Sequence, residues 1–100
     1  MYDLRVIATR TLRDFWTNHA DCEQQLTAWY RETEKSEFKN LNELKIEYPS
    51  ASILTDNRIV FNIKGNRYRL IVKFNFEYQI CWIRFVGTNA EYDKINANEI

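Results

Sequence analysis

One stretch near the middle of the chain, RIVFNIKGNRYRLIVKF (residues 58–74), constrains the fold more than any other. Apolar and polar side chains alternate on both sides of Gly65-Asn66, and a period of two residues indicates β-strands with one buried face. Glycine and asparagine both tolerate positive φ, so this pair predicts a two-residue hairpin turn. The turn sets the register, with 64 opposite 67, 62 opposite 69, 60 opposite 71 and 58 opposite 73. The chain should therefore contain an antiparallel hairpin.

This register sorts the side chains of the hairpin onto two faces, because residues opposite each other point to the same side of a sheet. The apolar face is the predicted core and carries Ile59, Phe61, Ile63, Tyr68, Leu70, Val72 and Phe74. The other face carries Arg58, Val60, Asn62, Lys64, Arg67, Arg69, Ile71 and Lys73. Like charges then face each other at 64/67 and 58/73, which destabilises a sheet by up to roughly 1 kcal/mol. Such an arrangement favours a face that binds an anionic partner.

The distribution of charge along the chain also favours an anionic partner. The formal net charge is zero, yet residues 58–84 hold six basic side chains and only one acidic residue, Glu77. A cationic segment within a neutral chain indicates an anionic ligand at that segment.

Another strand and a short helix should follow the hairpin. In ICWIRFVG (80–87), Cys81, Ile83 and Phe85 form a wholly apolar set, so we expect them to point inward and Arg84 to join the basic face. Thr88-Asn-Ala-Glu91 then has the pattern of a capping box, with Thr88 as N-cap and Asn89 as the first helical residue. The helix start at Asn89 should offer free backbone N–H groups and a partial positive charge beside the basic strand.

The first half of the chain has the periodicity of helices after a short strand over residues 2–8. Helices are predicted to begin with Thr9 as a cap, with a capping box at Asp21, and at Asn40. The predicted fold is therefore α+β. It has an antiparallel sheet of about four strands, two to three N-terminal helices packed on one face, and a short C-terminal helix, in a single domain over residues 1–100.

Several classes of function are disfavoured by the composition. No apolar run approaches the roughly 18–20 residues of a membrane span, and the start lacks the long apolar stretch of a signal peptide, so we expect a cytoplasmic protein without membrane contact. Cys22 and Cys81 have no metal or redox spacing and are predicted to be reduced core thiols. His19, the single histidine, cannot by itself form a metal site or a Ser-His-Asp triad. We expect no metal or other cofactor.

The remaining residue types suit the cleavage of RNA. Arginines can clamp a scissile phosphate and stabilise the extra negative charge of its transition state. RNA carries its own nucleophile, the ribose 2′-OH, so the protein must supply alignment, a base for the hydroxyl proton and an acid for the leaving 5′-oxygen.

Three segments resemble the HigB-type toxins of bacterial type II toxin–antitoxin operons, in the RelE/ParE-like superfamily. They are FNIKGNRYRL (61–70), WIRFV (82–86) and TNAEYDK (88–94), and the similarity extends over nearly the whole chain. The resemblance implies a RelE-like fold and a ribosome-dependent endoribonuclease that cuts translated mRNA. It also implies a cognate HigA-type antitoxin with a helix-turn-helix domain.

The resemblance further implies roles for individual residues. Arg69 and Arg84 would contact the scissile phosphate, and Tyr92 would orient the nucleotide or transfer a proton. The implied RNA-binding positions are Asn62, Lys64, Asn66, Arg67 and Lys73. Structural alternatives stay open, because the two arginines could be ordinary surface charges and Tyr92 could simply pack under the sheet.

Asn89 departs from the family pattern, which looks like T-H-x-E-Y-D with a histidine at this position. Histidine can exchange a proton near neutral pH and asparagine cannot. Three accounts are open: a deliberate inactivating change in a lethal protein, a naturally weakened protein, or proton transfer by a lysine, arginine or tyrosine. The alternative functions are a non-catalytic antitoxin- or RNA-binding protein of the same fold, and a toxin directed at a protein such as DNA gyrase.

Overall fold

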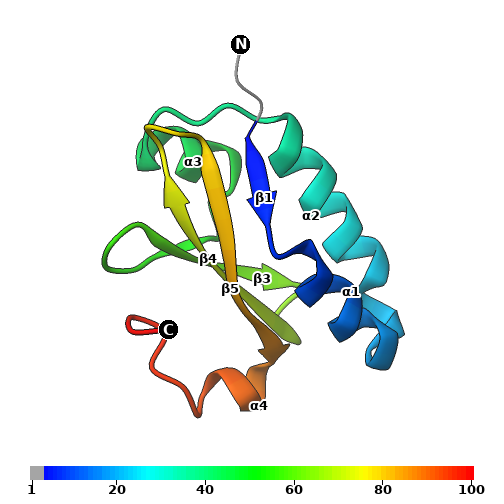
Figure 1. Cartoon of the computed structure of the whole chain (residues 1–100). Helices are drawn as coiled ribbons and strands as arrows, with labels where there is room; N and C mark the ends of the chain where they lie inside the picture. The colour runs from blue at the N-terminus through cyan, green and yellow to red at the C-terminus, as the bar shows by residue number, and fades with distance from the viewer. Residues whose placement is uncertain (1–3) are drawn as a thin grey trace.

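The computed structural model describes residues 4–100, which form a mixed sheet with helices packed on one face (Figure 1). The strands are β1 (Arg5–Ile7), β2 (Ser52–Ile53), β3 (Arg58–Ile63), β4 (Tyr68–Asn75) and β5 (Ile80–Thr88), in the spatial order β1-β5-β4-β3-β2. The helices are α1 (Thr9–Asn18), α2 (Glu23–Lys35), α3 (Leu41–Glu47) and α4 (Asn89–Tyr92), and a 3₁₀ turn, η1 (Ala20–Cys22), precedes α2.

The predicted hairpin is confirmed in its register but not in the conformation of its turn. Asn62 pairs with Arg69, Val60 with Ile71 and Arg58 with Lys73. Positive φ falls on Lys64 (52°) and Gly65 (64°) rather than on Gly65 and Asn66. The Arg67 N–H donates to the Lys64 carbonyl at 3.3 Å, which closes the turn. The register survives because the turn contains the expected number of residues.

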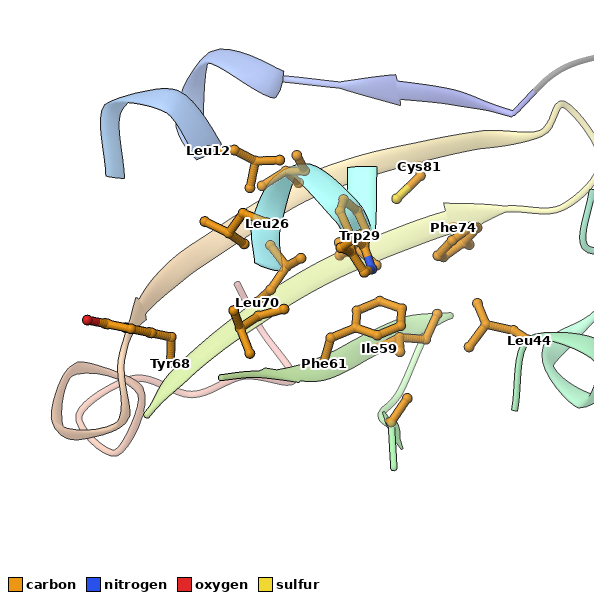
Figure 2. Packing of buried hydrophobic residues seen from close by; sticks show 14 of the residues in the cluster. Leu12, Leu26, Trp29, Leu44, Ile59, Phe61, Tyr68, Leu70, Phe74 and Cys81 are labelled. Atoms are coloured by element: carbon orange, nitrogen blue, oxygen red, sulfur yellow. The ribbon is translucent and has the colours of Figure 1, made fainter. Parts of the chain in front are cut away.

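The predicted core face is confirmed at each of its hairpin positions, all of which are buried. Leucines of α1, α2 and α3 pack against this face, together with Trp29, whose ring lies edge-on to Phe61 at 5.4 Å (Figure 2). Cys22 and Cys81 are also buried, and neither forms a disulfide within residues 4–100. Burial raises the pKa of both thiols, so they are predicted to stay protonated.

Strand β5 departs from the prediction at Phe85. Ile71 pairs with Phe85 and Val72 with Ile83, so Arg84 is an extra residue without a partner on β4. Such a β-bulge shifts the alternation of the strand by one residue. Cys81 and Ile83 therefore face the core as predicted, whereas Phe85 points to the opposite face. Val86 packs on the core in its place.

The sheet has five strands instead of about four, and it is not wholly antiparallel. The added strand is the short β2, which pairs with β3. Strand β1 runs parallel to β5. Parallel neighbours need a long connection, and here the connection includes the helices α1, α2 and α3. The predicted first strand, 2–8, lies partly outside the described residues. Within residues 4–100, no helix is long and apolar enough to span a membrane.

Helix starts were predicted with mixed success. Asn40 caps α3 as expected, since its side chain accepts from the Glu43 N–H at 3.0 Å. Thr9 is the first residue of α1 rather than its cap, and the capping position belongs to Ala8. The capping box at Asp21 is wrong, because Asp21 lies in η1 and α2 begins without a side-chain cap. The carboxylate of Asp21 instead contacts Lys64, Arg67 and Tyr68 of the hairpin.

Replacing Leu70 by alanine should destabilise the protein by about 2–5 kcal/mol, because its side chain is fully buried at the centre of β4. Urea unfolding followed by circular dichroism measures this loss. The matched control is Ile46→Ala on α3, since Ile46 is 80% exposed and its replacement should change stability by no more than about 0.5 kcal/mol. Equal losses in the two variants would show that the core has been misplaced.

Candidate functional site

The sheet face away from the helices carries three rows of side chains that run across β3, β4 and β5. Pairing across the strands defines the rows. They are Asn62–Arg69–Gly87 near the hairpin turn, Val60–Ile71–Phe85 in the middle, and Arg58–Lys73–Trp82 at the far end. The middle row is apolar, and Val60 and Ile71 are buried. The predicted basic face is therefore two polar ends separated by an apolar centre.

Arg69 is held in place by polar and aromatic groups. Its Nη1 donates to Oδ1 of Asn62 and, at 3.3 Å, to Oδ1 of Asn66. Its guanidinium carbon lies 5.6 Å from the centroid of the Tyr92 ring, within the range of a cation–π contact. No carboxylate forms an ion pair with Arg69 among residues 4–100. Three predicted site residues thus surround the guanidinium of a fourth, which lacks a carboxylate partner among the described residues.

Arg84 lies on the same face, as predicted, at the bulge in β5. Its side chain is exposed, and its Nε donates to the Ile100 main-chain oxygen at 3.4 Å. Arg58 on β3 donates to the same oxygen at 2.9 Å. Since one acceptor serves both strands, the end of the described chain lies across β4 on this face. Figure 1 shows the segment after α4 turning back toward the sheet. Sequence reasoning missed this crossing, because no periodic pattern marks it.

The junction of β5 and α4 places position 89 beside the hairpin. The predicted capping box is confirmed: Thr88 Oγ1 accepts from the Glu91 N–H at 3.2 Å, and the Thr88 N–H donates to Glu91 Oε1 at 2.9 Å. The hydrogen bond from Thr88 lowers the pKa of Glu91. The Asn89 N–H donates to the Arg67 carbonyl at 3.1 Å. This N–H is therefore not free, contrary to the sequence prediction, although the Asn89 side chain is exposed.

Two of the predicted RNA-binding cations, Lys64 and Arg67, face a carboxylate of the same chain. Arg67 Nη1 lies 3.0 Å from Asp21 Oδ2, and Lys64 Nζ lies 3.5 Å from the same oxygen. The Tyr68 hydroxyl donates to Asp21 Oδ1 at 2.5 Å, and Figure 2 shows this hydroxyl directed away from the core cluster. Asp21 therefore relieves the 64/67 repulsion that the register predicted.

The second like-charge pair, Arg58 and Lys73, is bridged in the same way. Asp56 Oδ2 lies 2.7 Å from Lys73 Nζ and 3.5 Å from Arg58 Nη1. Hydrogen bonding and charge from Lys73 lower the pKa of Asp56. The chain thus supplies its own anions at both positions where repulsion had suggested an external ligand. A sequence signal existed, since Asp56 directly precedes β3, but Asp21 lies far from the hairpin in sequence.

The geometry separates the predicted site residues into two groups. Asn62, Asn66, Arg69 and Tyr92 form one contact network. Arg84 contacts Ile100 instead, and Asn89 is joined to the hairpin through the Arg67 carbonyl. Lys64, Arg67 and Lys73 are each paired with an aspartate. Within residues 4–100 no group of three or more acidic, histidine or cysteine residues is placed to hold a metal ion. The available chemistry is that of arginine, amide and phenol groups.

A small α+β protein with a helix-covered sheet and an uncompensated arginine beside a helix start is suited to grip an anion. Comparison with known proteins identifies the family to which this chain belongs. The model for the HigB toxin, described as the RelE-like toxic component of a toxin–antitoxin system, matches residues 22–95. The mRNA interferase toxin HigB of Escherichia coli K12 is 32% identical over 96 residues, covering 94% of this chain and 92% of the relative. The mRNA interferase HigB of Shigella flexneri matches equally well. The chain belongs to the HigB toxin family.

The Asp21 cluster generates a prediction about pH. The Tyr68 hydroxyl, Arg67 and Lys64 lower the pKa of Asp21 from 3.8 to about 2. A carboxyl with a lowered folded-state pKa stabilises the fold above its unfolded pKa, and this stabilisation is lost as pH falls toward the folded value. Asp21→Asn should therefore lower Tm at neutral pH, and the difference from the parent should shrink between about pH 5 and pH 2.

Thermal melts at several pH values test this. The control is Asp14→Asn on α1, whose carboxylate is 71% exposed and lies 3.8 Å from Arg10; exposed pairs of this kind contribute little. A Tm difference for Asp21→Asn that is independent of pH would contradict the ionic role.

Proposed function

We propose that this protein is the toxin of a toxin–antitoxin pair and that it cleaves mRNA as a metal-independent endoribonuclease. Its membership of the HigB family and the mRNA interferase names of its relatives support this activity. We further propose that cleavage takes place on translating ribosomes in the cytoplasm, and that a HigA-type antitoxin neutralises the toxin. A sheet face that offers arginine to an anion fits an RNA substrate better than a protein target such as gyrase.

The observation that carries the proposal is that Arg69 is oriented by neutral groups and has no acidic partner among the described residues. Of the six cations between residues 58 and 84, four are paired with aspartates, which leaves Arg69 and Arg84 without an aspartate or glutamate partner among residues 4–100. The guanidinium of Arg69 is already oriented by Asn62, Asn66 and Tyr92. A positioned cation that lacks a counter-charge is suited to receive a phosphate.

In the proposed reaction, Arg69 binds a non-bridging oxygen of the scissile phosphate and Arg84 exchanges its main-chain contact for the same group. The ribose 2′-oxygen loses its proton to water and attacks phosphorus, the bond to the 5′-oxygen breaks, and that oxygen takes up a proton, so that a 2′,3′-cyclic phosphate and a 5′-hydroxyl are the products. The arginines stabilise the charge that grows on the phosphate oxygens during attack. Asn62 and Asn66 keep the guanidinium aligned, which preserves this stabilisation.

Proton transfer is the step for which this chain is poorly equipped. Position 89 begins α4, and Tyr92 on the same helix contacts Arg69. A titratable side chain at 89 would therefore stand close to the bound phosphate. Asparagine can donate a hydrogen bond there but cannot accept the 2′-OH proton. We propose that Asn89 weakens cleavage and that Tyr92 supplies what proton transfer remains. The specific alternative that Asn89 favours is a protein that binds RNA or antitoxin without cutting.

Replacing Asn89 by histidine should raise mRNA cleavage by roughly 10²–10⁴-fold, the usual contribution of general acid–base catalysis. Each form is induced in bacteria without antitoxin, and growth and mRNA ends are followed together. Asn89→Gln is the matched control, since it enlarges the side chain without adding a titratable group. If only the histidine form cuts, position 89 is the acid–base site. If both parent and histidine form cut equally, our role for position 89 is wrong; if neither cuts, the nuclease proposal fails.

Replacing Arg69 by alanine in the more active of these two backgrounds should reduce cleavage about 10²–10³-fold, as expected when one donor to the transition-state charge is lost. Purified protein, ribosomes and a translated message give the rate, and a thermal melt should show a folded variant, because Arg69 is only half-buried. Arg31→Ala is the control, as Arg31 is exposed on α2 behind the sheet. Similar rates for the two variants would remove Arg69 from the site.

A further inference from the structure

A polar cleft lies at the end of this sheet face opposite to Arg69. Its volume is about 480 Å³, within the range of roughly 300–1,000 Å³ that is typical of ligand sites. It is lined by Asp56, Asn57, Lys73, Asn75 and Trp82, among others. Lys73 is four residues from Arg69 along β4, about 13 Å at 3.3 Å per residue. This is the length of about four stacked nucleotides at ~3.4 Å each, or of fewer in an extended strand.

Asp56 provides an oriented hydrogen-bond acceptor in this cleft. Both of its contacts, from Lys73 Nζ at 2.7 Å and Arg58 Nη1 at 3.5 Å, use Oδ2. Oδ1 has no hydrogen-bond partner among residues 4–100. The two cations hold the carboxylate ionised and in place, so Oδ1 is available to accept an N–H from a ligand.

Asp56 and Asn57 are the two central residues of the tight turn between β2 and β3. Their φ values of 57° and 58°, and the hydrogen bond from the Arg58 N–H to the Thr55 carbonyl at 3.2 Å, match a type I′ hairpin turn, in which aspartate and asparagine are favoured. The Asn57 carbonyl accepts from the Phe74 N–H at 3.0 Å, which ties this loop to β4. This turn and its link to β4 fix the position of the Asp56 carboxylate at the edge of the cleft.

Trp82 and Asn75 also line the cleft, and they supply an aromatic surface and a hydrogen-bond donor, both of which can bind a nucleobase. Trp82 is opposite Lys73 in the sheet and is only half-buried, so part of its indole remains accessible. Asn75 Oδ1 accepts from the Tyr78 N–H at 2.9 Å, so its amide nitrogen is left to donate. An aromatic face, a fixed acceptor and an amide donor match the stacking surface and the polar edge of a nucleobase.

We propose that this cleft binds one nucleotide of single-stranded RNA that flanks the scissile phosphate. The base stacks on Trp82, and its amino group donates to Asp56 Oδ1. Guanine, adenine and cytosine carry such an amino group. Uracil lacks this amino group, and its one N–H on the same edge lies between two carbonyl oxygens that the carboxylate repels. This inference rests on the proposed function, because it requires the RNA strand to run from Arg69 along β4.

The test uses the whole chain and synthetic RNAs that carry a 2′-O-methyl group at the intended cleavage point. One RNA is short enough to contact only the Arg69 region. Two longer RNAs contain the same sequence with additional nucleotides, on the 5′ side in one and on the 3′ side in the other. Fluorescence anisotropy measures Kd. One of the longer RNAs should bind more tightly than the short one, and Trp82→Ala should weaken that RNA by roughly 5- to 100-fold, the usual effect of losing one stacked base. The short RNA should bind the variant and the parent equally.

Two controls separate stacking from misfolding. Trp82→Phe should restore most of the affinity, because it keeps an aromatic face. Tyr78→Ala should change nothing, since Tyr78 is 66% exposed in the neighbouring turn and does not line the cleft. An Asp56→Ala variant should lose the preference for an amino-bearing base over uracil at the flanking position, even if release of Lys73 raises overall affinity.

The outcomes distinguish the subsite from the proposed function. If Arg69→Ala weakens both RNAs while Trp82→Ala and Asp56→Ala change neither affinity nor base preference, the subsite is wrong and the phosphate site stands. If no RNA binds, or Arg69→Ala has no effect, the RNA face itself fails and the subsite fails with it. If Trp82→Ala impairs binding of the antitoxin but not of RNA, the cleft is a protein-docking surface and our inference is overturned.

Discussion

The pairing of β3 with β4 in a single register is the constraint on which the rest of the structure depends. It sends Phe61, Leu70 and their neighbours into the helices, and it sends Asn62 and Arg69 to the opposite face. A slip of one residue would exchange these two sets and bury the cations. The apolar side fixes the register because its burial is worth far more than the repulsion between like charges on the other side. The positions of Asn62 and Arg69 are thus set by the packing of side chains on the opposite face of the sheet.

Internal carboxylates decide which cations remain for a ligand. Asp21 and Asp56 neutralise the two like-charge pairs that the register creates, and each reaches the hairpin from outside it. Arg69 is held instead by neutral amides and an aromatic ring. The difference is chemical, because a carboxylate satisfies the charge of a guanidinium whereas an amide only orients it. The same ion pairs that occupy Lys73 and Arg58 fix the acceptor that we place in the cleft at Trp82.

The bulge in β5 connects the fold to the chemistry. By adding Arg84 between two paired residues, it keeps Cys81 and Ile83 in the core and turns Phe85 outward. A β-carbon at position 87 would lie 2.5 Å from the Phe85 ring, so Gly87 leaves the space into which this ring folds. Bulges often re-aim side chains beside active sites. Here the strand continues without interruption into the capping box that positions Asn89 and Tyr92.

The amino-acid sequence by itself determined the hairpin, the core face, the Thr88–Glu91 capping box and the motifs that indicate the family. These features rest on local periodicity and short-range hydrogen bonding, which neighbouring residues specify. The tertiary structure alone decided the pairing of Asp21 with Lys64 and Arg67, the parallel position of β1, the bulge at Arg84 and the crossing of the chain near Ile100. Except for the bulge, which lies between neighbouring strands, each of these joins segments distant in sequence, and no local pattern records which distant partner a side chain will meet. For the same reason only the fold could show that Arg69, alone among the cations of the hairpin, lacks an acidic partner in the described chain.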